Sequence, residues 1–171
     1  MGTLNSFQVS GSKAVGIVVL GVDFLKGLVA VLIASRLPDA SFGTAAVAGV
    51  AAVVGHNFPV WLRFHGGRGL ATAAGVFSIL CFPAVLLWGV AWAATFVPVR
   101  NVNVANAAAS VVLMLALWVL PDPIVGTFLP SGATLSGFQW FGTALLAVIL
   151  VRHVEPVRTF INKSGTRKAA V

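Results

Sequence analysis

The chain has 171 residues, of which 58% are hydrophobic and only 9% are charged. A soluble domain carries roughly 25% charged residues, so the composition excludes a soluble protein and predicts a single integral membrane domain over residues 1–171. The formal charge is +7, but the basic residues stand singly or in short clusters between apolar runs. That arrangement argues against nucleic-acid binding and is typical of the positive-inside rule.

The apolar runs predict an all-α membrane protein with about six transmembrane helices. In chain order, the predicted spans are residues 14–35, 42–56, 73–82, 84–97, 104–120 and 138–151. The second span is rich in small residues, which allow close helix packing. The third and fourth spans flank Pro83, so they are either two short helices or one long kinked helix. A Pro/Gly/Ser-rich loop at 121–137 and a basic tail from Arg152 complete the expected organisation.

The positions of the basic residues predict the orientation in the membrane. If the N-terminus is cytoplasmic and six helices alternate, only Arg36 lies outside, while Lys26 falls within the first span. The other basic residues then share the inner face: Lys13, Arg63, Arg68, Arg100, Arg152, Arg158, Lys163, Arg167 and Lys168. We therefore expect a multi-pass protein of the cell (inner) membrane whose active face is cytoplasmic.

Two charges lie inside the first span. Asp23 and Lys26 are three residues apart and share a helix face. Charges within a span usually pair or face a wet cavity, so this pair is either a structural ion pair or a functional one. The single cysteine, Cys81, lies in an apolar run and is expected to be a packing residue.

Residues 55–72 form a basic, glycine-rich interruption between apolar spans. Gly66, Gly67 and Gly69 precede a predicted helix start, where backbone N–H groups and the helix dipole attract anions. Arg68 adds a cationic fork suited to phosphate or carboxylate. The alternative is a loop that only touches lipid headgroups, but headgroup contact does not require the glycines. His56 is either a helix cap or a general base.

A second polar cluster stands at a later helix start. Arg100 precedes Asn101, Asn103 and Asn106, which places a cation beside three amides; the simpler interpretation is asparagine capping. Three separated histidines and the absence of a cysteine cluster from the sequence make a metal site unexpected. No cofactor is expected either.

Together these motifs resemble those of the bacterial acyl-phosphate:glycerol-3-phosphate acyltransferases, small seven-helix membrane enzymes. The family's glycine-loop signature is matched at Gly55, His56, Pro59, Gly66, Gly67, Gly69, Ala71 and Thr72, with Arg68 in place of the family lysine. The family's helix signature Asp-x-x-Lys-Gly is matched at Asp23, Lys26 and Gly27. The resemblance extends over most of the chain, including Arg152 and His153.

The chain also departs from this pattern. It begins partway through the family's first motif, at Gly2-Thr3-Leu4-Asn5, so a first helix and a serine are expected to be absent, and Gln8 stands where an arginine is expected. Two serines of the third motif are Asn103 and Asn106, and Pro156 replaces a tail asparagine. Such losses remove contacts of about 1.5–3 kcal/mol each. They leave a catalytically impaired paralogue, binding phosphate, lipid or a partner without turnover, as the alternative.

The resemblance implies acyl transfer from acyl phosphate to the 1-position of glycerol 3-phosphate, giving lysophosphatidic acid. It implies that His56 and Asn5 orient the substrates. The implied phosphate-binding residues are Arg63, Gly66, Gly67, Arg68, Gly69, Thr72, Arg100 and Asn103. The implied partners are the two substrates and the lipid bilayer, with a homo-oligomer as a further expectation. A small channel or transporter is a third hypothesis, which no internal repeat supports.

Overall fold

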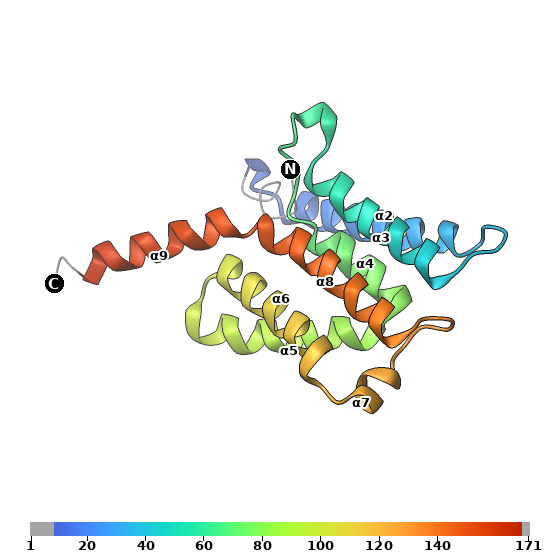
Figure 1. Ribbon diagram of the computed structural model, residues 1–171. Helices are drawn as coiled ribbons and strands as arrows, with labels where there is room; N and C mark the ends of the chain where they lie inside the picture. The colour runs from blue at the N-terminus through green and yellow to red at the C-terminus, as the bar shows by residue number, and fades with distance from the viewer. Residues whose placement is uncertain (1–8, 169–171) are drawn as a thin grey trace.

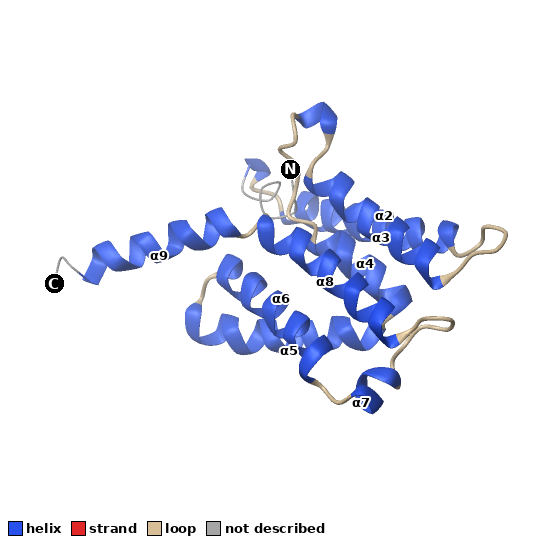
Figure 2. Ribbon diagram, viewed as in Figure 1, coloured by secondary structure: helices blue, strands red, loops and turns tan. Residues whose placement is uncertain are grey.

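The computed structural model describes residues 9–168, with side chains through residue 163, and this part of the chain is helical without a strand (Figure 2). The elements are α2 (Lys13–Ala34), α3 (Phe42–Asn57), the 3-10 turn η1 (Val60–Leu62), α4 (Leu70–Leu80), α5 (Phe82–Val99), α6 (Val102–Val119), α7 (Asp122–Gly126), α8 (Leu135–Val151) and α9 (Val154–Lys168). The predicted all-α fold is confirmed.

Each of the six predicted spans corresponds to a helix, but the helices differ in length. Within the described residues, α2, α5, α6 and the segment Phe42–Leu62, which joins α3 to η1, are long and apolar enough to cross a membrane. The 17-residue α8 continues into α9 through a bend of 49°. The 11-residue α4 is about 16 Å long, so it crosses only part of a hydrocarbon core of about 30 Å.

The chain breaks between α4 and α5, so the segment around Pro83 forms two helices rather than one kinked helix. Cys81 has an extended backbone, with φ −164° and ψ 81°, and its N–H closes α4 on the Phe77 carbonyl. Pro83 stands in the first turn of α5, where its missing N–H costs nothing. Cys81 itself is buried in the core, as predicted for a packing residue.

Two segments expected to be irregular contain helices. The loop at 121–137 includes the short α7 and the first residues of α8. The basic tail forms α9, whose first turn carries Glu155 and Pro156. An acidic residue and a proline both favour the start of a helix, because one complements the dipole and the other lacks an N–H that would be unsatisfied there.

Side-chain caps fix where several helices begin. Ser41 and Thr44 form a reciprocal capping box at the start of α3. Asn101 caps α6 by accepting hydrogen bonds from the N–H groups of Asn103 and Val104, at 3.0 and 3.1 Å. The interpretation of the asparagine cluster as a cap is thus correct for Asn101, which leaves the side chains of Asn103 and Asn106 for other contacts.

Glycines bring α2 and α4 together almost backbone to backbone. A Cβ on Gly27 would overlap the Thr72 carbonyl, and a Cβ on Gly75 would overlap the Phe24 carbonyl and lie 2.9 Å from the Leu28 nitrogen. Only glycine permits this approach, since no backbone atom can move aside. α4 consequently packs more extensively against α2 than against any other helix.

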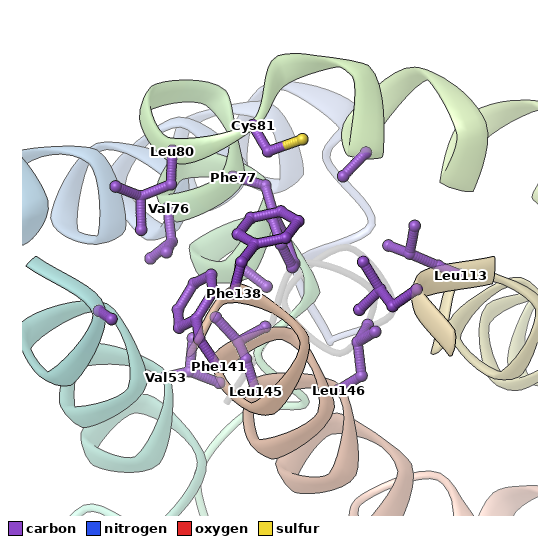
Figure 3. Packing of buried hydrophobic residues seen from close by; sticks show 14 of the residues in the cluster. Val53, Val76, Phe77, Leu80, Cys81, Leu113, Phe138, Phe141, Leu145 and Leu146 are labelled. Atoms are coloured by element: carbon purple, nitrogen blue, oxygen red, sulfur yellow. The ribbon is translucent and has the colours of Figure 1, made fainter. Parts of the chain in front are cut away.

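The hydrophobic core lies where α3, α4 and α8 meet (Figure 3). Phe77 of α4 contacts Phe141 of α8 edge-on at 5.7 Å between ring centroids, and Phe42 contacts both Phe138 and Phe141. Leu145 is fully buried beside them. This aromatic cluster fixes α8 against α4 and so determines where the residues after α8 lie.

The connections gather at two ends of the bundle (Figure 1). The α5–α6 turn and the α8–α9 bend lie at one end, and the α2–α3 turn and the segment after α7 lie at the other. α9, drawn in red, leaves the bundle from the first of these ends. Arg100 belongs to the α5–α6 turn and Arg152 to the α8–α9 bend at this first end, and a contact described below brings Arg68 to the start of α6 at the same end.

Candidate functional site

The glycine-rich loop between α3 and α4 closes on its own base. Arg63 and Phe64 have left-handed backbones, with φ 50° and 64°, and turn the chain back after η1. The returning segment donates the Gly66 N–H to the Asn57 carbonyl at 3.2 Å and the Gly67 N–H to the His56 carbonyl at 3.1 Å. These two amides are therefore used within the loop, and their predicted role as donors to an anion does not fit the structure.

Arg152, at the end of α8, clamps this loop from the other side. Its Nη2 donates to the Gly66 carbonyl at 3.0 Å and its Nε donates to the Gly67 carbonyl at 3.2 Å. Its guanidinium also lies 5.4 Å from the centre of the Phe58 ring. Both amides and both carbonyls of this glycine pair are thus bound, so the loop has one defined conformation.

The loop ends at an open helix N-terminus. Gly69 adopts a left-handed backbone, with φ 78°, and α4 starts directly after it. The N–H groups of Gly69, Leu70 and Ala71 make no hydrogen bond to another described residue. Unpaired amides in the first turn, together with the helix dipole, form a site with affinity for an anion.

Arg68 stands immediately before this N-terminus. Its Nη1 donates to the side-chain Oδ1 of Asn103 in the first turn of α6. Burial lowers the pKa of the Arg68 guanidinium, and the nearby positive charge of Arg152 lowers the pKa further. Two arginines that repel each other beside unpaired amides give a position at which an anion is favoured.

Asp23, Lys26 and His56 form a polar triad between α2 and α3. Lys26 Nζ lies 2.7 Å from Asp23 Oδ1, which confirms the predicted ion pair, and Lys26 also donates to His56 Nδ1. Asp23 Oδ1 lies 3.4 Å from the same His56 nitrogen. With Nδ1 accepting from Lys26, a neutral His56 carries its proton on Nε2.

The triad also fixes the position of the loop. A Cβ on Gly67 would overlap the His56 ring at Nε2 and lie 2.5 Å from Cε1, so the loop backbone rests directly on the imidazole. The His56 side chain is only 7% exposed. His56 thus connects the ion pair in α2 to the glycine loop, and this contact explains why only glycine fits at position 67.

Two polar residues next to the loop are fully buried. Asn57 donates from Nδ2 to the Val148 carbonyl at 3.3 Å, which ties α3 to α8. Thr72 packs against Gly27, and its hydroxyl has no hydrogen-bond partner among the described residues. Because Thr72 has no exposed surface, its predicted contact with a substrate phosphate does not fit this position.

A hydrogen-bonded network links α5, α6 and the bend after α8. Trp92 Nε1 donates to Asn106 Oδ1 at 2.8 Å, and Asn106 Nδ2 faces His153 Nε2 at 3.5 Å. His153 is buried, and its Nδ1 lies 2.9 Å from the Ile149 carbonyl. Since indole N–H can only donate, Asn106 must present its amide nitrogen to His153. Asn106 is therefore bound on both sides of its amide.

Not every predicted residue contacts the others. Arg63 is exposed in the turn after η1, and Arg100 is exposed with a left-handed backbone at the end of α5. Neither guanidinium makes a hydrogen bond or ion pair to a described residue. Asn5 lies outside the described residues. The structure brings together Arg68, Gly69 and Asn103 of the predicted set.

The prediction missed Arg152 as a site residue, although the tail motif contains it. Its contact to Gly66 joins residues 86 positions apart, and nothing local to Arg152 indicates that partner. One usable signal was available: Arg152 is the first basic residue after an apolar span and is predicted on the same face as the glycine loop. Asn57, beside His56 in the loop signature, gave no comparable signal.

An apolar cavity starts next to the open N-terminus and follows one face of α4. It is lined by Leu70, Ala73, Ala74 and Phe77 of α4, by Ala84, Val85 and Trp88 of α5, and by Leu113, Leu146 and Ile149 of α6 and α8. Three residues of this lining, Phe77, Leu113 and Leu146, are labelled in Figure 3. Trp88 is held in place by a hydrogen bond of 3.1 Å from Nε1 to the Ser110 hydroxyl. In the described part of the chain, no group of His, Cys, Asp and Glu could hold a metal ion.

Comparisons with known proteins identify relatives of this chain. Residues 1–163 match the family model described as glycerol-3-phosphate acyltransferase. A glycerol-3-phosphate acyltransferase of Anaeromyxobacter sp. (strain Fw109-5) is 38% identical over 162 residues, covering 92% of this chain and 74% of that protein. One of Pseudomonas putida (strain GB-1) is 37% identical over 158 residues, covering 92% and 75%.

Solved structures give the same result. The crystal structure of PlsY, an integral membrane glycerol 3-phosphate acyltransferase, in its lysophosphatidic acid form superposes with a TM-score of 0.77 at 28% identity, covering 95% of this chain and 76% of that chain. Its glycerol 3-phosphate form gives a TM-score of 0.75, with 95% and 74% covered.

Proposed function

The chain belongs to the glycerol-3-phosphate acyltransferase family, and from this membership we propose that it transfers an acyl group from an acyl phosphate to the 1-hydroxyl of glycerol 3-phosphate. It is a membrane acyltransferase of phospholipid synthesis. The acyl-phosphate donor and the roles of individual residues are the proposed part. The products would be lysophosphatidic acid and inorganic phosphate.

The observation that carries the proposal is the open N-terminus of α4 with Arg68 beside it. Gly69, Leu70 and Ala71 present unpaired N–H groups, and Arg68 and Arg152 give the position a positive potential. Both proposed substrates carry phosphate, which is the ligand that such a helix N-terminus binds well. Holding two phosphates side by side requires this concentration of positive charge.

The cavity along α4, about 50 Å³ in volume, supports a donor with an apolar acyl group. Its lining is apolar and starts at Leu70, one residue after Gly69 at the proposed phosphate position. An acyl phosphate bound with its phosphate at the α4 N-terminus would thus place its hydrocarbon chain along Ala73, Ala74 and Phe77. Burying each methylene contributes about 0.8 kcal/mol, so this cavity would favour an acyl donor over acetyl phosphate.

The proposed reaction needs no covalent enzyme intermediate. The 1-hydroxyl oxygen attacks the acyl carbonyl carbon, the bond from that carbon to the phosphate oxygen breaks, and the hydroxyl proton passes to a phosphate oxygen. The protein contributes by holding the hydroxyl next to the carbonyl and by stabilising charge on oxygen. Buried between Lys26 and Gly67, His56 would act by positioning the loop rather than as a base.

Contacts of the two substituted asparagines favour a working enzyme over the impaired paralogue. Asn103 binds Arg68, and Asn106 binds Trp92 and faces His153. Both residues are thus integrated into the end of the bundle that carries the proposed site. The positive-inside pattern further supports our proposal that this end faces the cytoplasm from the inner membrane.

The test is to supply the purified protein with palmitoyl phosphate and labelled glycerol 3-phosphate. We expect labelled lysophosphatidic acid from the wild type and at least about a hundred-fold less from Arg68→Ala, which loses both a charge and a charge-assisted bond (about 1.5–3 kcal/mol for the bond alone). If the wild type forms no more product than Arg68→Ala, the proposed enzymatic activity is refuted and the impaired paralogue is favoured. Product formed with acyl-coenzyme A but not with palmitoyl phosphate would refute the choice of donor.

A further inference from the structure

Arg68 has an unusual partner for a partly buried cation. It lies at the start of α4, and its Nη1 donates to Oδ1 of Asn103, 35 residues away in the first turn of α6. Asn103 is itself held in place, because its N–H donates to the capping Asn101 at 3.0 Å. The contact therefore joins two fixed helix starts through one side chain from each.

Arg68 needs such a partner because its surroundings are unfavourable. It is partly buried, and the charge of Arg152 repels it. The ion pairs among the described residues involve Asp23 and leave Arg68 without a carboxylate. Without Asn103, the guanidinium would gain by turning away from Arg152 toward water, and so away from the α4 N-terminus.

The chemical nature of the partner matters as much as its position. A carboxylate at this place would also hold Arg68, but it would neutralise the charge that a phosphate needs. An amide oxygen accepts the hydrogen bond without cancelling the charge. The remaining N–H groups of Arg68 then stay available, at full charge, for a phosphate.

We propose that Asn103 is a positioning residue, which holds Arg68 beside the N-terminus of α4 in a charged state, so that Arg68 binds the phosphate of glycerol 3-phosphate next to the acyl phosphate at that N-terminus. This inference rests on the proposed function, and it gives Asn103 a different role from direct contact with phosphate. Asn103 then acts on binding only through Arg68, and the two residues form one functional unit.

A double-mutant cycle tests this dependence. Glycerol 3-phosphate affinity is measured by calorimetry and, in parallel, KM and kcat are measured with palmitoyl phosphate. We expect Asn103→Ala to weaken affinity and raise KM at least about ten-fold, with kcat changed less than about three-fold, because one bond to a charged group is lost. In an Arg68→Ala background, Asn103→Ala should change affinity less than about two-fold. An undiminished effect in that background would mean that Asn103 binds substrate itself and would overturn the proposal.

Asn103→Asp separates positioning from charge. Aspartate has the same shape and can still accept a hydrogen bond from Arg68. The unfolding temperature in detergent should therefore fall by no more than a few degrees, or rise. Affinity for glycerol 3-phosphate should nevertheless fall at least about ten-fold, since the carboxylate neutralises Arg68 and repels phosphate. Unchanged affinity in Asn103→Asp would contradict the charge argument.

The calorimetric measurement keeps this proposal distinct from the proposed function. A wild type that binds glycerol 3-phosphate but forms no product would refute the reaction, and the affinity cycle would still decide the role of Asn103. A wild type that does not bind glycerol 3-phosphate would overturn both.

Discussion

The clamp made by Arg152 gives the sharpest prediction about the glycine loop. Replacing Arg152 with Ala removes two hydrogen bonds, at 3.0 and 3.2 Å, and the contact with the Phe58 ring. Truncating a charged donor costs about 1.5–3 kcal/mol per bond, and the lower figure is appropriate because Arg152 is only partly buried. Two bonds give about 3 kcal/mol, which is on the order of a hundred-fold in the equilibrium between the ordered loop and its open forms.

We expect this loss to appear as a KM for glycerol 3-phosphate that rises by roughly ten- to a hundred-fold in proteoliposomes. Arg152→Lys is the informative companion, because lysine keeps the charge but lacks the planar fork of N–H groups with which arginine meets both carbonyls. If the loop geometry matters, lysine restores only a small part of the lost affinity. The matched control is Arg158→Ala, which removes an exposed arginine of α9. A KM within about two-fold of wild type for Arg152→Ala would refute the reasoning.

Three further predictions concern the membrane-embedded part. Gly27→Ala should lower the unfolding temperature in detergent, since overpacking costs about 1–3 kcal/mol, while Gly89→Ala, with open space around it, should not. Trp88→Ala enlarges the apolar cavity and should change the preference among acyl-chain lengths. Its control is Trp118→Ala, which loses an equivalent indole–hydroxyl bond away from the cavity and should leave the chain-length preference unchanged. Lys26→Met leaves the Asp23 carboxylate with only His56 as a partner and should lower the free energy of unfolding by about 1–3 kcal/mol. This loss is smaller than that expected for a fully buried pair, because Lys26 is partly exposed. An unfolding temperature equal to wild type, or an unchanged chain-length profile, would contradict the respective prediction.

Local features of the sequence were sufficient to predict most of the helices. Apolar runs placed α2 and α3 within a residue of their observed bounds, because a membrane span needs a long uninterrupted run. The Asp23–Lys26 ion pair was predictable because residues three apart share a helix face, so the spacing alone brings the two side chains within reach. α9 was missed because its sequence is too polar for a span, although Glu155 and Pro156 mark a helix start.

The site was less predictable because its contacts join distant parts of the chain. Glycines and Arg68 indicated an anion site, but the sequence does not show that the Gly66 and Gly67 amides fold back onto α3. Nor does it show that Arg152 holds the carbonyls of the same residues, or that Asn103 meets Arg68. The last two contacts depend on how α8 and α6 pack in the bundle, which local sequence does not reveal.

The close approach of α2 and α4 has a consequence for movement. With Gly27 and Gly75 pressed against opposing backbone, these two helices form a rigid pair that cannot separate or slide without breaking the contact. α5 packs less extensively on α4, and the apolar cavity lies between them. Any widening that releases a lipid product sideways into the bilayer is therefore expected on the α5 side, with the α2–α4 pair as the stationary wall.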